Sequence, residues 1–217
     1  MLTFALAKGR LAENTVKLLC RAGIDCANVL DDTRQLELFD ASGAYRFIMV
    51  KPSDVPVYIE RGIADAGVAG KDTLLEAGVD VYEMLDLGFG ACRLCIAGRR
   101  GARGNGGIKK SNNNNTLTVA TKYYNVAKKY YEKLGQNVDI VRLSGSVELA
   151  PILDLSDVIL DIVESGKTLE ANNLEVFTEI CKVSARLAVN KVSLKTKKDI
   201  ILPLIAKLEG LVTGSGK

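Results

Sequence analysis

The chain has 217 residues, of which 47% are hydrophobic and 25% are charged; this is ordinary for a globular protein of one large or two small domains and excludes a disordered chain. The formal net charge of +3 is too small to indicate binding to nucleic acid or to an acidic membrane. The sequence contains no histidine, so the commonest general base and every Ser-His or Cys-His catalytic arrangement are absent.

The chain begins with a predicted strand and helix that are joined by a basic turn. Residues 2–7 are apolar and predict a strand, and a helix is expected over 11–21. Lys8, Gly9 and Arg10 lie between them, where a helix N-terminus favours an anion; a solvated basic turn is an equally good interpretation. The two cations leave no apparent signal peptide, and no apolar run has the length of a membrane span, so we expect a cytoplasmic protein.

The next segment alternates between predicted strands and helices. Strands over 34–39 and 45–50 are separated by an Ala-Ser-Gly turn, and we expect Ser53 to cap a helix over 54–61. A strand of small residues over 64–69 follows. Strands that alternate with helices pair in parallel through right-handed crossovers, so the pattern predicts an α/β sheet.

Three turns follow a predicted strand and precede a predicted helix, at residues 8–10, 70–73 and 165–168. Ligands of open α/β sheets bind beyond the carboxyl ends of the strands. The three turns can therefore line one crevice.

The middle of the chain contains a cysteine pair and a basic segment. Strands over 85–89 and 92–97 are expected to lead into a second lobe. Cys92 and Cys95 have Cys-x-x-Cys spacing, but a strand points their side chains apart. An odd total of five cysteines without a secretion signal argues against a disulfide framework and favours buried thiols.

Residues 98–115 are rich in Gly, Asn and cations and predict a mobile surface loop. The cations of this loop could also recruit an anionic substrate or nucleic acid.

Two further strand–helix pairs follow that segment. A strand over 116–120 leads through a turn at 121–124 to a helix over 125–134. A strand over 138–143 leads to the helix that contains Glu148.

The C-terminal part is predicted to return to the first lobe. Residues 180–192 alternate well enough for one strand, and a final helix is expected over 199–211, with Pro203 as a kink or late start. Residues 213–217 should fray.

The segment over 158–168 carries the strongest functional signal. Residues 158–163 predict a buried strand that Asp161 interrupts, and an unpaired buried carboxylate is costly. The turn at 165–168 then opens a helix and so favours a phosphate, while Asp161 and Glu164 could accept hydrogen bonds from sugar hydroxyls, as a phosphorylated ribose requires. The two carboxylates converge only if the strand ends near Val163. Alternatively, Asp161 pairs with a core cation and the turn is only a connection.

A P-loop is excluded at this turn. Gly166-Lys167-Thr168 resembles the end of that motif, which requires a glycine five positions earlier, where Asp161 stands.

The pattern of Glu148, Asp154, Ser156 and residues 161–169 resembles the signature of ATP phosphoribosyltransferase. The family pattern has glycine where Asp154 stands, and that glycine would supply a positive φ at the turn after the Glu148 helix. The resemblance extends from residue 2 to about residue 211 and includes the stretches 7–10, 65–72 and 120–123.

The resemblance implies two α/β lobes of the type II periplasmic-binding-protein fold, with the active site in the inter-lobe cleft. Lobe I would comprise residues 1–92, lobe II residues 93–177 with a phosphoribosyl pyrophosphate loop at 161–169, and residues 178–217 would return to lobe I and form the C-terminal helix. The implied reaction transfers 5-phosphoribosyl from phosphoribosyl pyrophosphate to N1 of ATP with release of pyrophosphate, the first step of histidine biosynthesis, with Mg2+ as cofactor. The length resembles the short form, a homodimeric catalytic subunit that works with a regulatory subunit resembling histidyl-tRNA synthetase.

Site residues are implied by position in the same way. The catalytic residues would be Arg10 and Arg34, which reach the substrate phosphates and help pyrophosphate leave, and Asp161, which binds the ribose with Glu164. The 5-phosphate would be held by Ser165, Gly166, Lys167, Thr168 and Leu169. Further substrate-binding positions are Lys8, Gly9, Lys71, Asp72, Thr121, Lys122 and Glu148. We assign no protein residue as a metal ligand.

A solute-binding module of the same architecture is the alternative from another functional class. The missing export signal and the carboxylates beside the phosphate turn count against it.

Overall fold

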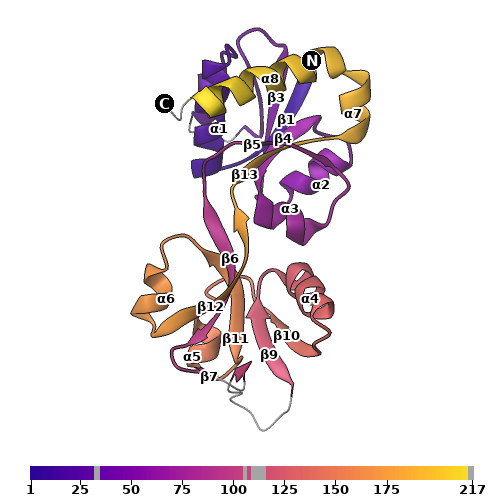
Figure 1. The fold of residues 1–217 in the computed structure, drawn as a ribbon. Helices are drawn as coiled ribbons and strands as arrows, with labels where there is room; N and C mark the ends of the chain where they lie inside the picture. The colour runs from indigo at the N-terminus through magenta and orange to yellow at the C-terminus, as the bar shows by residue number, and fades with distance from the viewer. Residues whose placement is uncertain (32–34, 105–106, 109–115, 215–217) are drawn as a thin grey trace. The chain divides into compact units, whose positions relative to one another are not determined.

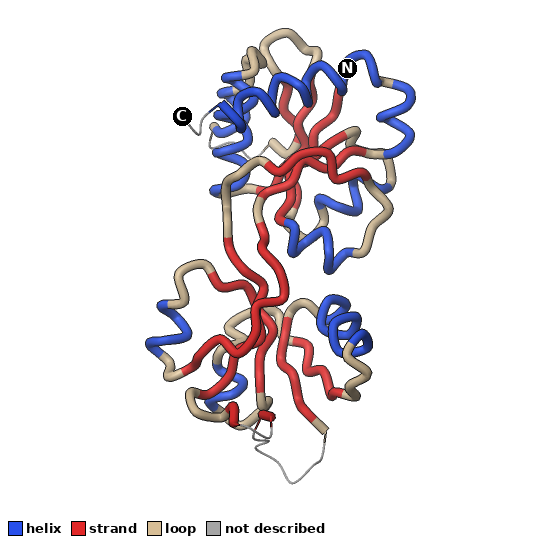
Figure 2. The backbone as a smooth tube through the Cα atoms, viewed as in Figure 1, coloured by secondary structure: helices blue, strands red, loops and turns tan. Residues whose placement is uncertain are grey.

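The structure is a computed structural model that describes residues 1–31, 35–104, 107–108 and 116–214. The chain divides into two compact units: unit 1 comprises Met1–Gly90 and Ser184–Lys217, and unit 2 comprises Ala91–Val183. Each unit has its own sheet covered by helices (Figure 2). Among the described residues, no helix has both the length and the apolar character needed to cross a membrane.

The sheet of unit 1 has six strands in mixed orientation. In spatial order they are β2 (Glu37–Phe39), β3 (Tyr45–Val50), β1 (Leu2–Ala7), β4 (Ala66–Gly70), β13 (Ala185–Val189) and β5 (Tyr82–Asp86). β1 pairs in parallel with β3 and β4, as the strand–helix alternation predicted. β2 pairs antiparallel with β3, and β13 pairs antiparallel with both β4 and β5. The antiparallel β13 enters from the returning segment of the chain, with no crossover helix before it, and a parallel pair requires such a crossover.

The helices of unit 1 cover both faces of this sheet. They are α1 (Arg10–Arg21), the 3-10 helix η1 (Ala27–Leu30), α2 (Val55–Glu60), α3 (Lys71–Ala77), α7 (Lys191–Thr196) and α8 (Lys198–Gly214). Alternate residues of β1 belong to two hydrophobic clusters: Phe4 packs with side chains of α1 and α8, whereas Ala5 packs with side chains of α2 and α3. The period of two along a strand therefore builds a three-layer unit, and Figure 1 shows the two helix layers on either side of the sheet.

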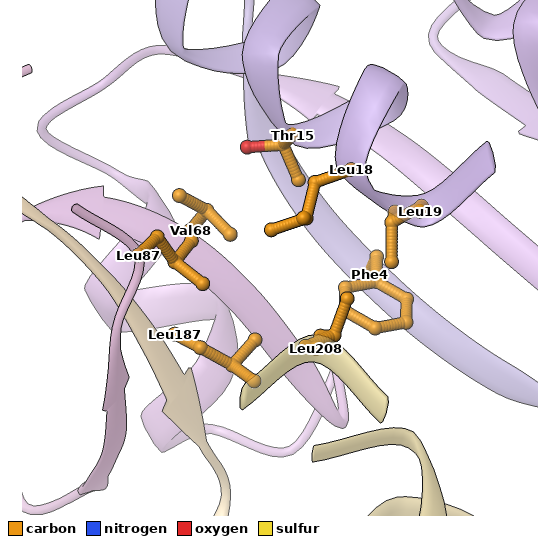
Figure 3. A pocket seen from close by; sticks show the side chains of 8 residues that line it. All are labelled: Phe4, Thr15, Leu18, Leu19, Val68, Leu87, Leu187 and Leu208. Carbon is orange, nitrogen blue, oxygen red and sulfur yellow. The ribbon is translucent and has the colours of Figure 1, made fainter. Parts of the chain in front are cut away.

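A small cavity lies in the layer between α1, α8 and the sheet (Figure 3). It measures about 10 Å³ and is lined by Phe4, Thr15, Leu18, Leu19, Val68, Leu87, Leu187 and Leu208. The Thr15 hydroxyl donates to Leu11 O at 2.7 Å, so it is already paired. An apolar space of this size holds at most about one water molecule, and we assign it no ligand.

A buried carboxylate ties β4 to the segments that pack beside it. Asp65 is 5% exposed and accepts hydrogen bonds from Thr3 N at 2.8 Å, Ser193 Oγ at 2.6 Å and Lys197 Nζ at 2.7 Å. Burial by itself raises the pKa of Asp65, but the hydrogen bonds from Lys197, Ser193 and Thr3 outweigh it and hold the pKa below the ordinary value of 3.8. The ionised carboxylate therefore fastens β1 and α7 to the residue that directly precedes β4.

Unit 2 contains a five-stranded sheet with helices on both faces. The spatial order is β10 (Val138–Arg142), β9 (Leu117–Thr121), β11 (Val158–Val163), β6 (Cys92–Arg99) and β12 (Leu174–Val183), and β7 (Arg103–Gly104) pairs separately with β8 (Gly107–Ile108). β10, β9 and β11 are parallel, whereas β6 is antiparallel to both β11 and β12. The helices are α4 (Tyr124–Lys133), α5 (Leu149–Ile152) and α6 (Lys167–Ala171), and α4 and α6 lie on opposite sides of the sheet (Figure 1).

The strands predicted over 85–89 and over 180–192 were wrong in their bounds. The strand expected over 85–89 is β5, which ends at Asp86 because Gly88 follows with a φ of 73° and donates its N–H to the Asp86 carboxylate. The single strand expected over 180–192 is instead the end of β12 and the whole of β13, separated by Ser184. The helix α7 follows, which the sequence analysis did not predict. Asn190 caps it, because its side chain accepts hydrogen bonds from Val192 N and Ser193 N.

The expected cap of α2 was wrong, and the structure describes only part of the basic segment. Ser53 does not cap α2: the N-cap is Asp54, without a side-chain cap hydrogen bond, and Ser53 Oγ donates to Asp54 Oδ1 instead. In the basic segment 98–115, Arg99 still belongs to β6 and the short β7–β8 hairpin follows. Residues 105–106 and 109–115 of this segment lie outside the described residues.

Candidate active site

The corner between β11 and α6 has the geometry that the sequence predicted. β11 ends at Val163, α6 begins at Lys167, and Gly166 between them has a φ of 78° and a ψ of −3°. This left-handed conformation is open to glycine at little cost. Four of the five side-chain positions from Glu164 to Thr168 are exposed, so the corner is open to solvent.

Two buried apolar side chains hold this corner in place. Val163 and Leu169 are 5% and 6% exposed, and both belong to one cluster with Ile159, Ala150 and Leu174. The apolar residues thus fix the two ends of the turn to the sheet, while the polar residues between them stay accessible. An accessible turn between fixed ends is suited to binding a ligand with little reorganisation.

Asp161 is a partly buried carboxylate at the end of β11. Its side chain is 16% exposed, and Oδ1 lies 3.8 Å from Lys122 Nζ and accepts from Ile162 N at 2.8 Å. The Lys122 side chain is 38% exposed, so this cation comes from a surface turn. β11 ends at Val163. The side chains of Asp161 and Glu164 can converge only if the strand ends there, so this requirement is met.

The loops after the three parallel strands of unit 2 lie along one edge of its sheet. In the strand register, Thr121 of β9 pairs with Leu160 of β11 and with Arg142 of β10. Because the strands are parallel, their carboxyl ends meet at the same edge. The turn that contains Lys122 and the corner that begins at Glu164 therefore follow neighbouring strands of this edge.

The buried side chain of Thr121 stabilises the turn at this edge of the sheet through hydrogen bonds. It is 0% exposed; its Oγ1 donates to Leu160 O at 2.6 Å and accepts from Tyr123 N at 2.8 Å. These bonds fix the turn from which Lys122 projects, and the Lys122 ammonium lies 4.9 Å from the centroid of the Tyr123 ring.

The sequence analysis did not single out Arg142 at the end of β10. Its guanidinium lies 4.4 Å from the centroid of the Tyr124 ring, which is within cation–π range. The rule that ligands bind at the carboxyl ends of parallel strands could have found this residue, because residues 138–143 were already predicted to form a strand.

Glu148 and Asp154 flank the short helix α5 near the same sheet. Glu148 is the N-cap residue of α5 and is partly exposed. Asp154 has a φ of 57°, so the position where the family has glycine does adopt the left-handed conformation. Arg99 Nη2 donates to Ile152 O at 3.0 Å and lies 2.8 Å from Asp154 Oδ1, which supports the turn at the end of α5.

In unit 1, the turn of Lys8, Gly9 and Arg10 connects β1 to α1, and all three residues are exposed. Gly9 has a φ of 103° and a ψ of −162°, a combination that is essentially limited to glycine. Arg10 is the first residue of α1, and the Gly9 carbonyl accepts from Glu13 N at 3.1 Å. The turn thus presents two cations at the N-terminus of a helix of 12 residues.

Lys71 and Asp72 begin α3, at the carboxyl end of β4. Lys71 Nζ is paired with Glu83 Oε2, and Glu83 Oε1 lies 3.2 Å from Arg186 Nη1. Arg186 Nη2 also lies 2.8 Å from Asp86. Lys71 is therefore held by a chain of charges on β5 and β13 that the sequence analysis did not foresee.

Arg34, the other arginine of the predicted mechanism, lies outside the described residues. Within the described part of the chain, no group of three or more His, Cys, Asp or Glu side chains is placed to hold a metal ion.

A family model described as HisG: ATP phosphoribosyltransferase matches residues 51–210. The curated ATP phosphoribosyltransferase from Caldicellulosiruptor bescii is 49% identical over 213 residues, which cover 98% of this chain and 99% of the relative. That from Clostridium kluyveri is 46% identical over 205 residues, which cover 94% of this chain and 91% of the relative. The chain belongs to the ATP phosphoribosyltransferase family. The enzyme transfers the 5-phosphoribosyl group of phosphoribosyl pyrophosphate to N1 of ATP, the first step of histidine biosynthesis, and the predicted function is confirmed.

Solved structures support the fold and the short form of ATP phosphoribosyltransferase. The ATP phosphoribosyl transferase (HisG:HisZ) complex from Thermotoga maritima matches with a TM-score of 0.83 at 34% identity, covering 100% of both chains. The GluR0 ligand-binding core from Nostoc punctiforme, in complex with (L)-glutamate, matches with a TM-score of 0.58 at 15% identity, covering 99% of this chain and 94% of that chain. At this identity the second match shows the fold alone, and it confirms the expected likeness to periplasmic binding proteins.

Proposed function

We propose that the β11–α6 corner is the phosphoribosyl pyrophosphate site of this ATP phosphoribosyltransferase. The observation that carries the proposal is the exposed turn around Gly166, which follows the strand that carries Asp161, a carboxylate that is 16% exposed. Backbone N–H groups from Ser165 to Leu169 would donate to the 5-phosphate, because the first N–H groups of a helix have no partner within it. The carboxylates of Asp161 and Glu164 would accept from the ribose 2- and 3-hydroxyls.

The cations of unit 1 suit the leaving group. We assign Arg10, and Arg34 from the family resemblance, to the pyrophosphate, where a guanidinium donates in a bidentate geometry that matches phosphate oxygens. Lys8 and Lys71 would add positive charge around the polyphosphates of the two substrates. The ion pairs that hold Lys71 on Glu83 would fix its position before substrate binds.

The reaction requires no general base from the protein. N1 of adenine attacks the anomeric carbon of the ribose as the bond to pyrophosphate breaks, and the nucleophile is a ring nitrogen lone pair that needs no general base. The absence of histidine is therefore no obstacle. Positive charge develops on the sugar ring, which we assign to Asp161, and negative charge develops on the leaving pyrophosphate, which we assign to Arg10. Preorganised charges placed where charge develops lower the barrier.

Magnesium fits this scheme as an ion carried by the substrates. Mg2+ commonly binds through substrate phosphates with few protein ligands. When bound, the ion supplies charge neutralisation on the polyphosphates.

We further propose that the chain forms a dimer that assembles with a regulatory subunit resembling histidyl-tRNA synthetase. The likeness to the chain of the HisG:HisZ complex from Thermotoga maritima over its whole length supports the regulatory subunit, and the dimer is proposed from the family resemblance.

A single assay tests the function and the partner together. The purified chain is mixed with ATP, phosphoribosyl pyrophosphate and Mg2+, with and without the candidate regulatory subunit, and pyrophosphate release is followed. Turnover under either condition supports the proposal. Binding of phosphoribosyl pyrophosphate without turnover under both conditions would favour a solute-binding module instead.

For the site itself, Asp161→Asn should weaken phosphoribosyl pyrophosphate binding far more than Asp139→Asn, which changes an exposed carboxylate of β10. Equal effects of the two substitutions would refute the assignment.

A further inference from the structure

The thiols of Cys20 and Cys26 lie next to each other in unit 1, at the end of α1. Their Sγ atoms are 3.8 Å apart. Cys20 is in the last turn of α1 and exposed, whereas Cys26 directly precedes η1 and is 0% exposed. The pair was not singled out in the sequence, because the expectation for all cysteines was a buried thiol, and that expectation was wrong for Cys20.

We propose that Cys20 and Cys26 form a modification site at which low-molecular-weight disulfides of the glutathione type oxidise the pair to an intrachain disulfide. The Sγ atoms would have to approach from 3.8 Å to about 2.05 Å. Cys20 lies in the last turn of α1, and the loop that leads to Cys26 contains Gly23, with a φ of 87°.

The two thiols differ in reactivity in a way that sets the order of events. Burial, the hydrogen bond with Cys20 and the charges of Asp40 and Asp25 raise the pKa of Cys26 to about 12. Cys26 therefore stays a protonated, inaccessible thiol at neutral pH, and an external disulfide can reach only Cys20.

The exchange balances without any further reactant. The Cys20 thiolate attacks one sulfur of the small disulfide, forms a mixed disulfide and expels one small thiolate, which takes up a proton. Cys26 then attacks Cys20 Sγ, the mixed S–S bond breaks, and the departing small thiolate takes up the Cys26 proton. Two protein thiols are oxidised, and one small disulfide is reduced to two thiols.

The experiment uses the folded chain and glutathione disulfide. The five free cysteines should fall to three titratable thiols after denaturation, the protein should lose the mass of two hydrogen atoms, and peptide mapping should link Cys20 to Cys26. Dithiothreitol should restore all five thiols. Cys26→Ala should stop at a stable mixed disulfide on Cys20, and Cys20→Ser should leave Cys26 reduced.

Other results overturn the proposal. Five thiols with unchanged mass would show that the pair does not react, and a disulfide mapped to any other pair would show that the 3.8 Å approach does not direct the chemistry. A Cys20→Ser protein that still oxidises Cys26 would refute the order of attack. Peptide mapping of the protein without substitutions decides the question by itself. The outcome therefore does not depend on whether the Cys26→Ala variant folds.

Discussion

Replacing Gly166 with alanine tests whether the β11–α6 corner is held in a conformation that only glycine adopts freely. The φ of Gly166 is 78°, and an added Cβ would meet only Val163 Cγ1, at 3.8 Å, which is an ordinary contact. The substitution therefore introduces no clash, and its whole cost is conformational. For an L-residue in the left-handed region that cost is about 1–2 kcal/mol.

This energy must appear either in folding or in binding. If the corner keeps its conformation, Gly166→Ala lowers the free energy of unfolding by about 1–2 kcal/mol. If the corner relaxes in the free protein, the same amount is lost when phosphoribosyl pyrophosphate restores the turn, which weakens binding by roughly 5- to 30-fold. The two losses should therefore sum to about 1–2 kcal/mol.

Two other glycines provide matched controls. Gly135, after α4, has a φ of 65° and no atom within 4 Å of an added Cβ, so Gly135→Ala should lose the same stability without any loss of affinity. Gly210 lies inside α8 with no positive φ and no such neighbour, so Gly210→Ala should stabilise the protein by about 0.5–1 kcal/mol.

Urea unfolding measures the first quantity and calorimetric titration with phosphoribosyl pyrophosphate measures the second. If Gly166→Ala changed neither stability nor affinity, the left-handed conformation would not constrain the corner. If Gly135→Ala weakened binding as much as Gly166→Ala, the corner would not be the phosphate site.

Arg10→Ala should lower kcat by roughly 10²- to 10³-fold and raise KM much less, because a group that stabilises the leaving pyrophosphate acts mainly in the transition state; steady-state kinetics measure both, and a variant with normal turnover would remove Arg10 from the mechanism. Asp65→Asn should cost about 1.5–3 kcal/mol of stability at neutral pH, since it removes a buried carboxylate that accepts a hydrogen bond from Lys197, whose side chain is 37% exposed. Because the folded-state pKa of Asp65 is lowered, this contribution is full above the ordinary value of 3.8 and is lost as the pH falls through the lower folded-state pKa; unfolding curves of the two proteins should therefore converge only in acid, and a constant difference down to pH ~2 would contradict the lowered pKa. At Asp154, where φ is 57°, alanine should be less stable than glycine by about 1 kcal/mol, whereas loss of the exposed ion pair with Arg99 should cost both variants about 0–1 kcal/mol; equal urea midpoints for the two variants would argue against the left-handed turn.

Local patterns predicted most of the elements that carry the proposed site. β11 has the predicted bounds, and β1 and β3 match as well, because apolar runs bounded by turn residues specify a strand by themselves. The positive φ at position 154 is what the family pattern, which has glycine there, indicated. The predicted residues from Glu164 to Thr168 lie in one exposed corner for the same reason: they are neighbours in the sequence.

Local patterns failed where pairing between distant segments decides the structure. Residues 180–192 alternate as one strand, yet the chain changes sheets at Ser184, because residues up to Val183 pair with β6 and those from Ala185 pair with β4. The pattern of alternation is the same on both sides of Ser184. Asn190 did carry a local signal, since asparagine is a preferred N-cap, and that signal could have ended the strand prediction.

The sequence by itself determined the chemistry of this protein: a carboxylate-bearing strand, a glycine turn and a helix start lie within about a dozen consecutive residues, and covalent connection alone keeps such groups together. The tertiary structure alone decided which distant groups support them. The pairing of Lys71 with Glu83, the short approach of Cys20 to Cys26 and the ionised state of buried Asp65 all depend on contacts between separate elements. Their energies come from burial and from charges brought within a few ångströms by packing, and neither quantity exists until the chain has folded.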